Sequence, residues 1–262
     1  MGKRILTTVL GLPILFFVLL QGGRLLTVSL LIVTLIGLHE FYTSVSGCTY
    51  QPVPWVGYAG TLSVYGVLIA ADGTSSLDTI LPLVLMAFLI YWVMTHHRHR
   101  FEDMMITWFG FTYVTLLLIP LAFIEQLALS HAVWLVFIIS WSCDSGAYLI
   151  GCGIGRHKLC PSISPKKTIE GAIGGIAGSI LGSLIFALLF MPEHLTALII
   201  LGLIGAVFSQ LGDLAASLIK RTVGIKDFGR LFPGHGGVLD RFDSILFTTP
   251  VVYLFLVHWL LR

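Results

Sequence analysis

Apolar stretches of about the length that spans a bilayer recur along this chain, and they constrain its fold more than any other feature. A helix needs roughly 20 apolar residues to cross the hydrocarbon core. The chain has 262 residues, of which 56% are hydrophobic and only 11% are charged. We therefore predict an all-α polytopic membrane protein with about nine transmembrane helices. The expected spans are about 5–20, 24–42, 55–71, 77–95, 104–123, 131–151, 171–190, 196–218 and 244–261.

The distribution of basic residues predicts the orientation of these helices. With nine helices and a cytoplasmic N-terminus, the cytoplasmic segments hold 13 of the 15 Lys and Arg residues, leaving only Arg24 and Arg262 outside. Cytoplasmic loops of membrane proteins are enriched in Lys and Arg, so we predict a cytoplasmic N-terminus. No small-residue cleavage pattern follows the first apolar stretch, which we interpret as a helix rather than a signal peptide. The net charge of +2 gives no basic surface for nucleic acid.

Residues suited to chemistry are concentrated in the second half of the chain. No internal repeat or low-complexity linker interrupts the sequence, so we predict one integrated membrane domain. Within it, residues 1–125 are interpreted as N-terminal scaffold helices and residues 126–262 as the catalytic membrane region. In the first half, His39 and Glu40 lie at a predicted helix end. The run from His96 to Arg100 is interpreted as a solvated face near lipid headgroups, with a metal site as the alternative.

Four aspartates stand out in the second half. Asp144 and Asp213 fall inside predicted spans, where a carboxylate is costly unless it faces a wet cavity, a cation or a partner. Asp240 and Asp243 are three residues apart, a spacing that places both on one face of a helix. Because Mg²⁺ prefers oxygen ligands, we predict a Mg²⁺ site at Asp213, Asp240 and Asp243. The alternatives are helix-to-helix hydrogen bonds for the first pair and a helix cap for Asp240.

Basic residues accompany these acids on the same predicted face of the membrane. Each one alone is typical of a topology anchor, but together with the carboxylates they indicate a phosphorylated ligand held through a metal. The chain has no Walker A sequence, which disfavours a P-loop kinase or ATPase. Gly174, Gly178 and Gly182 recur every fourth residue and predict close helix packing. The basic residues are Lys166, Lys167, Lys220, Arg221, Lys226 and Arg241.

The polar segment between Ser217 and Asp243 resembles the signature of phosphatidate cytidylyltransferases, the CDP-diacylglycerol synthases. The matching pattern is Ser217-x-x-Lys220-Arg221-x4-Lys226-Asp227-x5-Pro233-Gly234-His235-Gly236-Gly237-x-x-Asp240-Arg241-x-Asp243. A second block, Asp144 to Tyr148 with Ser164 to Gly171, is also similar to that family, so the resemblance covers about residues 130–262. Ile169 departs from it, because the family usually has an aromatic residue before the Glu.

The resemblance implies transfer of CMP from CTP to phosphatidic acid, which forms CDP-diacylglycerol and pyrophosphate with Mg²⁺ as cofactor. Under this hypothesis Asp144 and Asp227 orient basic groups or hold a second cation, and His235 donates to a phosphate. The implied metal ligands are Asp213, Asp240 and Asp243. The implied catalytic residues are Asp144, Lys166, Lys167, Asp227 and His235. The implied substrate-binding residues are Ser164, Lys220, Arg221, Lys226, Gly236, Gly237 and Arg241.

The expected partners are therefore CTP, phosphatidic acid and the lipid bilayer, without nucleic acid, and a homodimer is left open. The expected location is the bacterial cytoplasmic (inner) membrane, with the active site facing the cytoplasm. Alternatives are a transferase that uses CTP to cytidylylate another lipid phosphate, such as that of an isoprenoid ether lipid, and a lipid kinase that uses CTP. A secondary transporter with acids near helix ends is an alternative of another class. A structural membrane protein that uses the polar segment as a regulatory loop is a further alternative.

Overall fold

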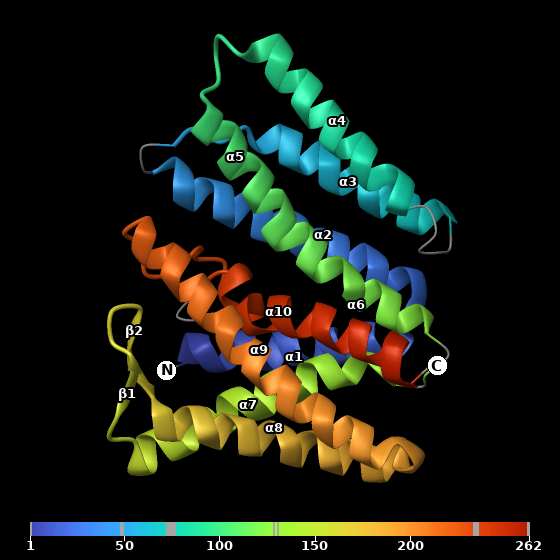
Figure 1. The fold of residues 1–262 in the computed structure, drawn as a ribbon, viewed down its shortest axis with the longest axis vertical. Coiled ribbons are helices and arrows are strands. Elements are labelled where there is room, and N and C mark those ends of the chain that lie inside the picture. The colour runs from blue at the N-terminus through green and yellow to red at the C-terminus, as the bar shows by residue number, and fades with distance from the viewer. Residues whose placement is uncertain are drawn as a thin grey trace. The chain divides into compact units, whose positions relative to one another are not determined.

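The computed structural model describes residues 2–47, 50–71, 77–127, 129, 131–232 and 236–260, with the side chains of residues 2–10 and 71 left aside. The described chain is almost entirely helical (Figure 1). Seven of its helices are long and apolar enough to cross a membrane, and two shorter apolar helices cover Gly11–Gln21 and Pro54–Ala70. The prediction of a polytopic helical membrane protein is therefore confirmed. The seven long spans are Gly23–Ser46, Leu77–Thr95, Phe101–Gln126, Val133–Ile154, Ile169–Phe190, Pro192–Thr222 and Leu239–Leu260.

The chain forms two compact units. The N-terminal unit combines Met1–Gln126 with Ile225–Asp240, and the C-terminal unit combines Leu127–Gly224 with Arg241–Arg262. The segment Ile225–Asp240, which carries part of the polar signature, thus packs with the N-terminal helices.

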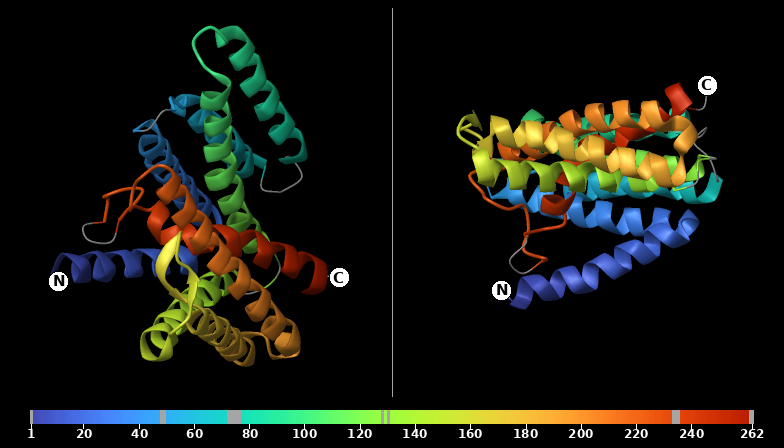
Figure 2. Two further views of the ribbon diagram at one scale, coloured as in Figure 1. Left: turned by 60° about the vertical axis from the view of Figure 1, so that its left-hand side comes forward. Right: turned by 90° about the horizontal axis from the view of Figure 1, so that it is seen from below.

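The N-terminal unit is an assembly of helices joined by short connections. Its elements are α1 (Gly2–Gln21), α2 (Gly23–Ser46), α3 (Pro54–Ala71), α4 (Leu77–Thr95), α5 (Phe101–Gly110), a π-helix (Phe111–Leu116) and α6 (Leu117–Gln126). Gly22 and Gly23 have φ angles of 59° and 54°, a left-handed conformation that favours glycine. From this turn α1 and α2 diverge, as the right-hand view of Figure 2 shows. Glu125 in α6 accepts a hydrogen bond from the backbone N–H of Gly23 at 3.1 Å.

A π-helical segment interrupts the span from Phe101 to Gln126. Pro120 lacks an N–H, and its ring would clash with the carbonyl four residues earlier in a regular α-helix. That carbonyl belongs to Leu116, the last residue of the π-helix. We therefore ascribe the wider turn to Pro120.

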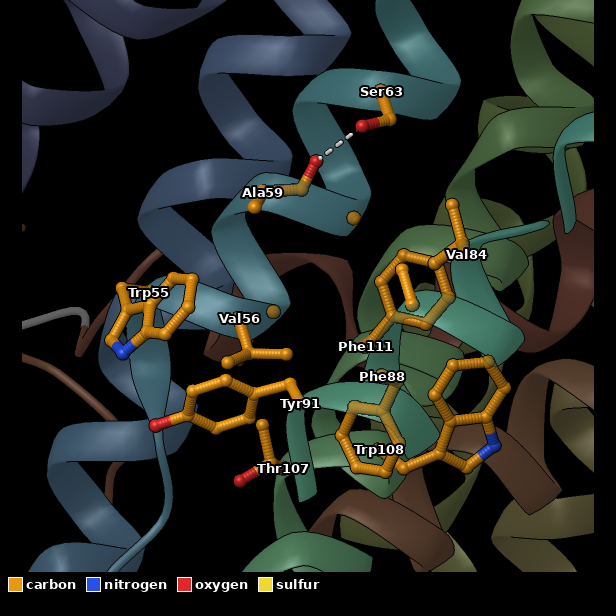
Figure 3. A pocket seen from close by; sticks show the side chains of 13 residues that line it. Trp55, Val56, Ala59, Ser63, Val84, Phe88, Tyr91, Thr107, Trp108 and Phe111 are labelled. Atoms are coloured by element: carbon orange, nitrogen blue, oxygen red, sulfur yellow. Dashed lines mark hydrogen bonds between the residues drawn. The ribbon is translucent and has the colours of Figure 1, made fainter. Parts of the chain in front are cut away.

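An apolar cavity of about 160 Å³ lies in the N-terminal unit beside α3, α4 and α5. Figure 3 shows Trp55, Tyr91, Phe88 and Trp108 around it, with the hydroxyl of Ser63 turned back to its own helix. That hydroxyl donates to the carbonyl of Ala59 at 2.8 Å. Aromatic and small apolar side chains form most of the cavity wall, and no pocket of this kind was predicted from the sequence.

The C-terminal unit packs three helices closely. Its elements are α7 (Val133–Ile154), β1 (Lys158–Cys160), β2 (Ser164–Thr168), α8 (Ile169–Phe190), a 3-10 helix (Pro192–His194), α9 (Leu195–Thr222), most of α10 (Leu239–Phe255) and a π-helix (Leu256–Leu260). Helix α8 packs against both α7 and α9, as Figures 1 and 2 show. A Cβ atom at Gly178 or Gly182 would meet Ser142 of α7 at 2.5 or 2.7 Å. These glycines therefore let the helices approach, as predicted from their spacing.

Two local features differ from the prediction of an all-helical chain. First, β1 and β2 form an antiparallel hairpin in a segment that was expected to be a loop. Second, α10 begins at Leu239 rather than near residue 244. Hydropathy missed this first turn because it contains the charged residues Asp240, Arg241 and Asp243.

Candidate active site

Asp213 and Asp243 come together where α9 and α10 cross. A Cβ atom at Gly212 would lie 2.7 Å from the carbonyl oxygen of Asp243 and 3.0 Å from the Cβ of Phe247. Glycine at position 212 therefore allows the backbone of α10 to approach α9 next to Asp213. Both carboxylates are half-buried in the C-terminal unit.

Asp144 joins this cluster from α7. Its Oδ2 accepts a hydrogen bond from the hydroxyl of Ser244 at 3.4 Å, and the Ser140 hydroxyl one turn earlier donates to the Thr248 hydroxyl at 3.1 Å. Because residues four apart lie on the same face of a helix, these two bonds fix the register of α7 against α10. Asp144 thus faces the residues that follow Asp243.

Lys167 supplies positive charge to the cluster from the hairpin. Its Nζ lies 2.5 Å from Oδ2 of Asp213, and the two side chains are 25% and 29% exposed. Thr168, the next residue, caps the N-terminus of α8 by accepting the N–H of Gly171 at 3.1 Å. The backbone at Lys167 is therefore fixed by the end of β2 and the capped start of α8.

The cluster holds the three carboxylates of Asp144, Asp213 and Asp243, and three basic side chains act on them. Asp213 interacts electrostatically with both Asp144 and Asp243, and these repulsions are opposed by Lys167 near Asp144 and by Lys220 near Asp243. Lys220 is buried, and Ser217 one turn before it donates to Oδ1 of Asp213 at 3.4 Å. Carboxylates that lie this close together within a membrane protein offer oxygen ligands to a cation.

The predicted metal ligands are divided between the two units. Asp213 and Asp243 belong to the C-terminal unit, whereas Asp240 belongs to the N-terminal unit. Among the described residues, no group of three His, Cys, Asp or Glu side chains forms a preassembled metal site. Oδ2 of Asp240 accepts two backbone N–H groups, from Phe228 at 2.8 Å and Gly237 at 2.9 Å. The assignment of Asp240 as a metal ligand stays a prediction.

The other predicted residues of the C-terminal unit have different surroundings. Ser164 pairs with Cys160 in the hairpin, and the exposed side chain of Lys166 alternates in direction with that of Lys167 along the strand. Nε of Arg221 donates to the carbonyl of Ile163 in the hairpin turn at 3.4 Å. Arg241 is exposed and interacts electrostatically with Asp144.

The remaining predicted residues lie in the segment Ile225–Asp240 of the N-terminal unit. Lys226 and Asp227 are exposed, and Gly237 is buried. Gly236 has a φ of 84°, and its carbonyl accepts the N–H of Phe232 at 2.9 Å. The N–H of Gly237 is engaged by Asp240 within this segment. His235 lies outside the described residues, as do Pro233 and Gly234.

Sequence reasoning missed Glu40, a buried carboxylate of α2. Its two oxygens accept the N–H groups of Val238 at 2.9 Å and Leu239 at 2.8 Å, almost 200 residues away in the chain. The signal was present, because a carboxylate within an apolar stretch is costly unless it has partners. That argument singled out Asp144 and Asp213 but was not applied to Glu40, which was expected at a helix end.

Comparison with known proteins shows the family to which the chain belongs. The model of the cytidylyltransferase family matches residues 2–259. A phosphatidate cytidylyltransferase of Staphylococcus aureus (strain COL) is 36% identical over 269 residues, which cover 98% of this chain and 100% of the relative. Phosphatidate cytidylyltransferases of Staphylococcus saprophyticus and Staphylococcus haemolyticus are 33% and 34% identical, with the same coverage. The chain belongs to the cytidylyltransferase family.

Proposed function

We propose that this protein transfers a cytidylyl group from CTP to phosphatidate, forming CDP-diacylglycerol and pyrophosphate in phospholipid synthesis. The observation that supports it best is the grouping of Asp144, Asp213 and Asp243 with Lys167 in a unit built of apolar helices. A lipid substrate is presented by the bilayer and a nucleotide comes from water. Such a reaction needs charged groups within an otherwise apolar unit, and these four side chains supply them.

In the proposed reaction, a phosphate oxygen of phosphatidate attacks the α-phosphorus of CTP. The bond between that phosphorus and the oxygen bridging to the β-phosphate breaks, and pyrophosphate leaves with the electron pair. The second pKa of a phosphate monoester is about 6, so the nucleophile is largely ionised without a strong general base. The protein must mainly position two anions and offset their repulsion. Lys167 is placed to do so while holding Asp213.

A divalent cation fits the acidic cluster. Mg²⁺ is commonly bound by one or two carboxylates together with water and substrate phosphates, and Asp213 and Asp243 offer such oxygens next to each other. When bound, Mg²⁺ neutralises triphosphate charge and makes the α-phosphorus more electrophilic. Asp144 would orient Lys167 and Arg241, or share in holding a second cation.

The proposed orientation follows from the same distribution of charge. The seven long and two shorter apolar helices would give nine spans. With the N-terminus in the cytoplasm, the segments that hold Lys167, Lys220 and Arg241 face cytosolic CTP. We place the protein in the bacterial cytoplasmic membrane on this basis, and a homodimer stays a prediction.

CTP labelled at either the α- or the γ-phosphate tests the proposed reaction. Purified protein, Mg²⁺ and phosphatidate are expected to place the α-label in the lipid and the γ-label in pyrophosphate, in equal amounts. A γ-label in the lipid would instead indicate a CTP-dependent lipid kinase. Transfer only to an isoprenoid lipid phosphate would indicate a related transferase, and no transfer at all would overturn the proposal.

A further inference from the structure

One face of α2 contacts the segment Ile225–Asp240. Gly37, Glu40, Phe41 and Ser44 follow the spacing of a single helix face. The Ser44 hydroxyl donates to the carbonyl of Phe228 at 2.9 Å, and the Phe41 and Phe228 rings lie 6.5 Å apart between centroids. A Cβ atom at Gly37 would be 3.8 Å from Leu239. The helix interpreted as scaffold therefore holds a segment that carries part of the family signature.

Carboxylates engage three consecutive N–H groups at the start of α10. The N–H of Gly237 donates to Asp240, and those of Val238 and Leu239 donate to the two oxygens of Glu40. The first N–H groups of a helix have no partner within it. Glu40 thus caps α10 from a distant part of the chain, and only 6% of its surface is exposed.

Two glycines of the segment make room for the Glu40 side chain. A Cβ atom at Gly229 would overlap Oε1 of Glu40, and one at Gly237 would overlap Oε2. Hydrogen bonds on one side and glycines on the other enclose the carboxylate. The fit is specific to the length and charge of Glu at this position, because Asp would fall short of the N–H groups and Gln would present a donor to one of them.

We propose that Glu40 is a positioning residue for cytidylyl transfer. By binding the N–H groups of Val238 and Leu239, it fixes the start of α10 and the adjoining Gly237, which the family signature assigns to substrate binding. Glu40 itself is enclosed by protein and does not contact the reacting atoms in this proposal. The inference rests on the proposed function, since it treats this segment as part of the CTP-binding machinery.

The variant Glu40→Gln tests this role, with Glu125→Gln as its matched control. Glu125 also accepts a glycine N–H in the N-terminal unit, but its donor is Gly23 at the start of α2 and not a residue of the segment Ile225–Asp240. Amide hydrogen exchange of residues 228–239 is expected to become faster by roughly tenfold or more in Glu40→Gln and to stay unchanged in Glu125→Gln. This measurement does not depend on which reaction the protein catalyses.

Kinetics with CTP and phosphatidate then separate positioning from simple loss of stability. A smaller folded fraction lowers the maximal rate and leaves the KM for CTP unchanged, whereas a misplaced segment raises that KM. We expect the KM for CTP to rise by roughly tenfold or more in Glu40→Gln only. Faster exchange with an unchanged KM would reduce Glu40 to a structural residue and overturn the proposal, as would unchanged exchange.

A double variant tests the enclosure directly. Gly229→Ala alone is expected to raise the KM for CTP, because its methyl group overlaps the Glu40 carboxylate. Combined with Glu40→Ala, it is expected to add little to the effect of Glu40→Ala alone, since contacting residues are not additive. Fully additive effects would contradict the enclosure. If wild-type protein showed no CTP-dependent activity, the proposed function would be wrong. The hydrogen-exchange data would still decide whether Glu40 stabilises the backbone at the start of α10.

Discussion

Two neighbouring lysines show how much the surroundings of a residue decide its role. Lys166 and Lys167 were both assigned from the sequence as catalytic residues. The strand turns them in opposite directions, so that Lys167 contacts Asp213 while Lys166 is exposed. The pair therefore divides into one residue within the acidic cluster and one exposed residue.

Replacing each lysine by Met should separate these roles. Lys167→Met removes the counter-charge of Asp213 and leaves three carboxylates repelling one another, so we expect turnover to fall by on the order of 10², where about 1.4 kcal/mol corresponds to tenfold. Lys166→Met keeps the ion pair between Lys167 and Asp213, so its turnover should fall far less. Turnover at saturating CTP is the measurement, and equal losses in both variants would contradict the division.

The residues of the site differ in how readily the sequence reveals them. Asp144 and Asp213 could be predicted, because the cost of a carboxylate within an apolar stretch points to function. Glu40 carried the same signal, but its partners Val238 and Leu239 could not be predicted. Contacts between residues so distant in sequence are fixed by tertiary packing, which a single sequence does not display.

At the level of elements, hydropathy predicts where helices lie but not how they meet. Residues 77–95 were predicted as a span and are observed as Leu77–Thr95. The hairpin of β1 and β2 was missed because its strands are short and carry charged residues instead of an apolar alternation. The π-helix was likewise hidden, since Pro120 indicates a distortion without specifying its kind.

The crossing of α9 and α10 depends on the absence of a side chain at Gly212. Gly212→Ala would place a methyl group 2.7 Å from the carbonyl of Asp243, forcing the helices apart and moving Asp213 from Asp243. We expect a lower thermal midpoint in detergent and a loss of turnover of roughly tenfold or more. Gly153→Ala in α7 is the control, because its Cβ meets nothing within 4 Å. A fully active Gly212→Ala protein would argue against the importance of this crossing.

At the scale of the whole molecule, the charge distribution predicts which loops face the cytoplasm. Single cysteines placed at Arg230 and Lys158, in a background without native cysteines, should be shielded from an impermeant thiol reagent added outside intact cells. A cysteine at the exposed Glu193, between α8 and α9, should react. Labelling of position 230 from outside would reverse the proposed orientation and separate the polar segment from cytosolic CTP.

Removing the charge of the C-terminal unit's carboxylates at constant size shows whether they carry the chemistry. Asp213→Asn and Asp243→Asn should each lower Mg²⁺-dependent transfer from CTP to phosphatidate by on the order of 10² or more, with near-normal thermal midpoints. The transfer activity of the double variant should be little lower than that of either single variant, because the effects of groups that act as one unit are not additive. Asp78→Asn in α4 should keep full activity. If both Asp213→Asn and Asp243→Asn are stable and retain wild-type, Mg²⁺-dependent transfer, these carboxylates do not carry the chemistry.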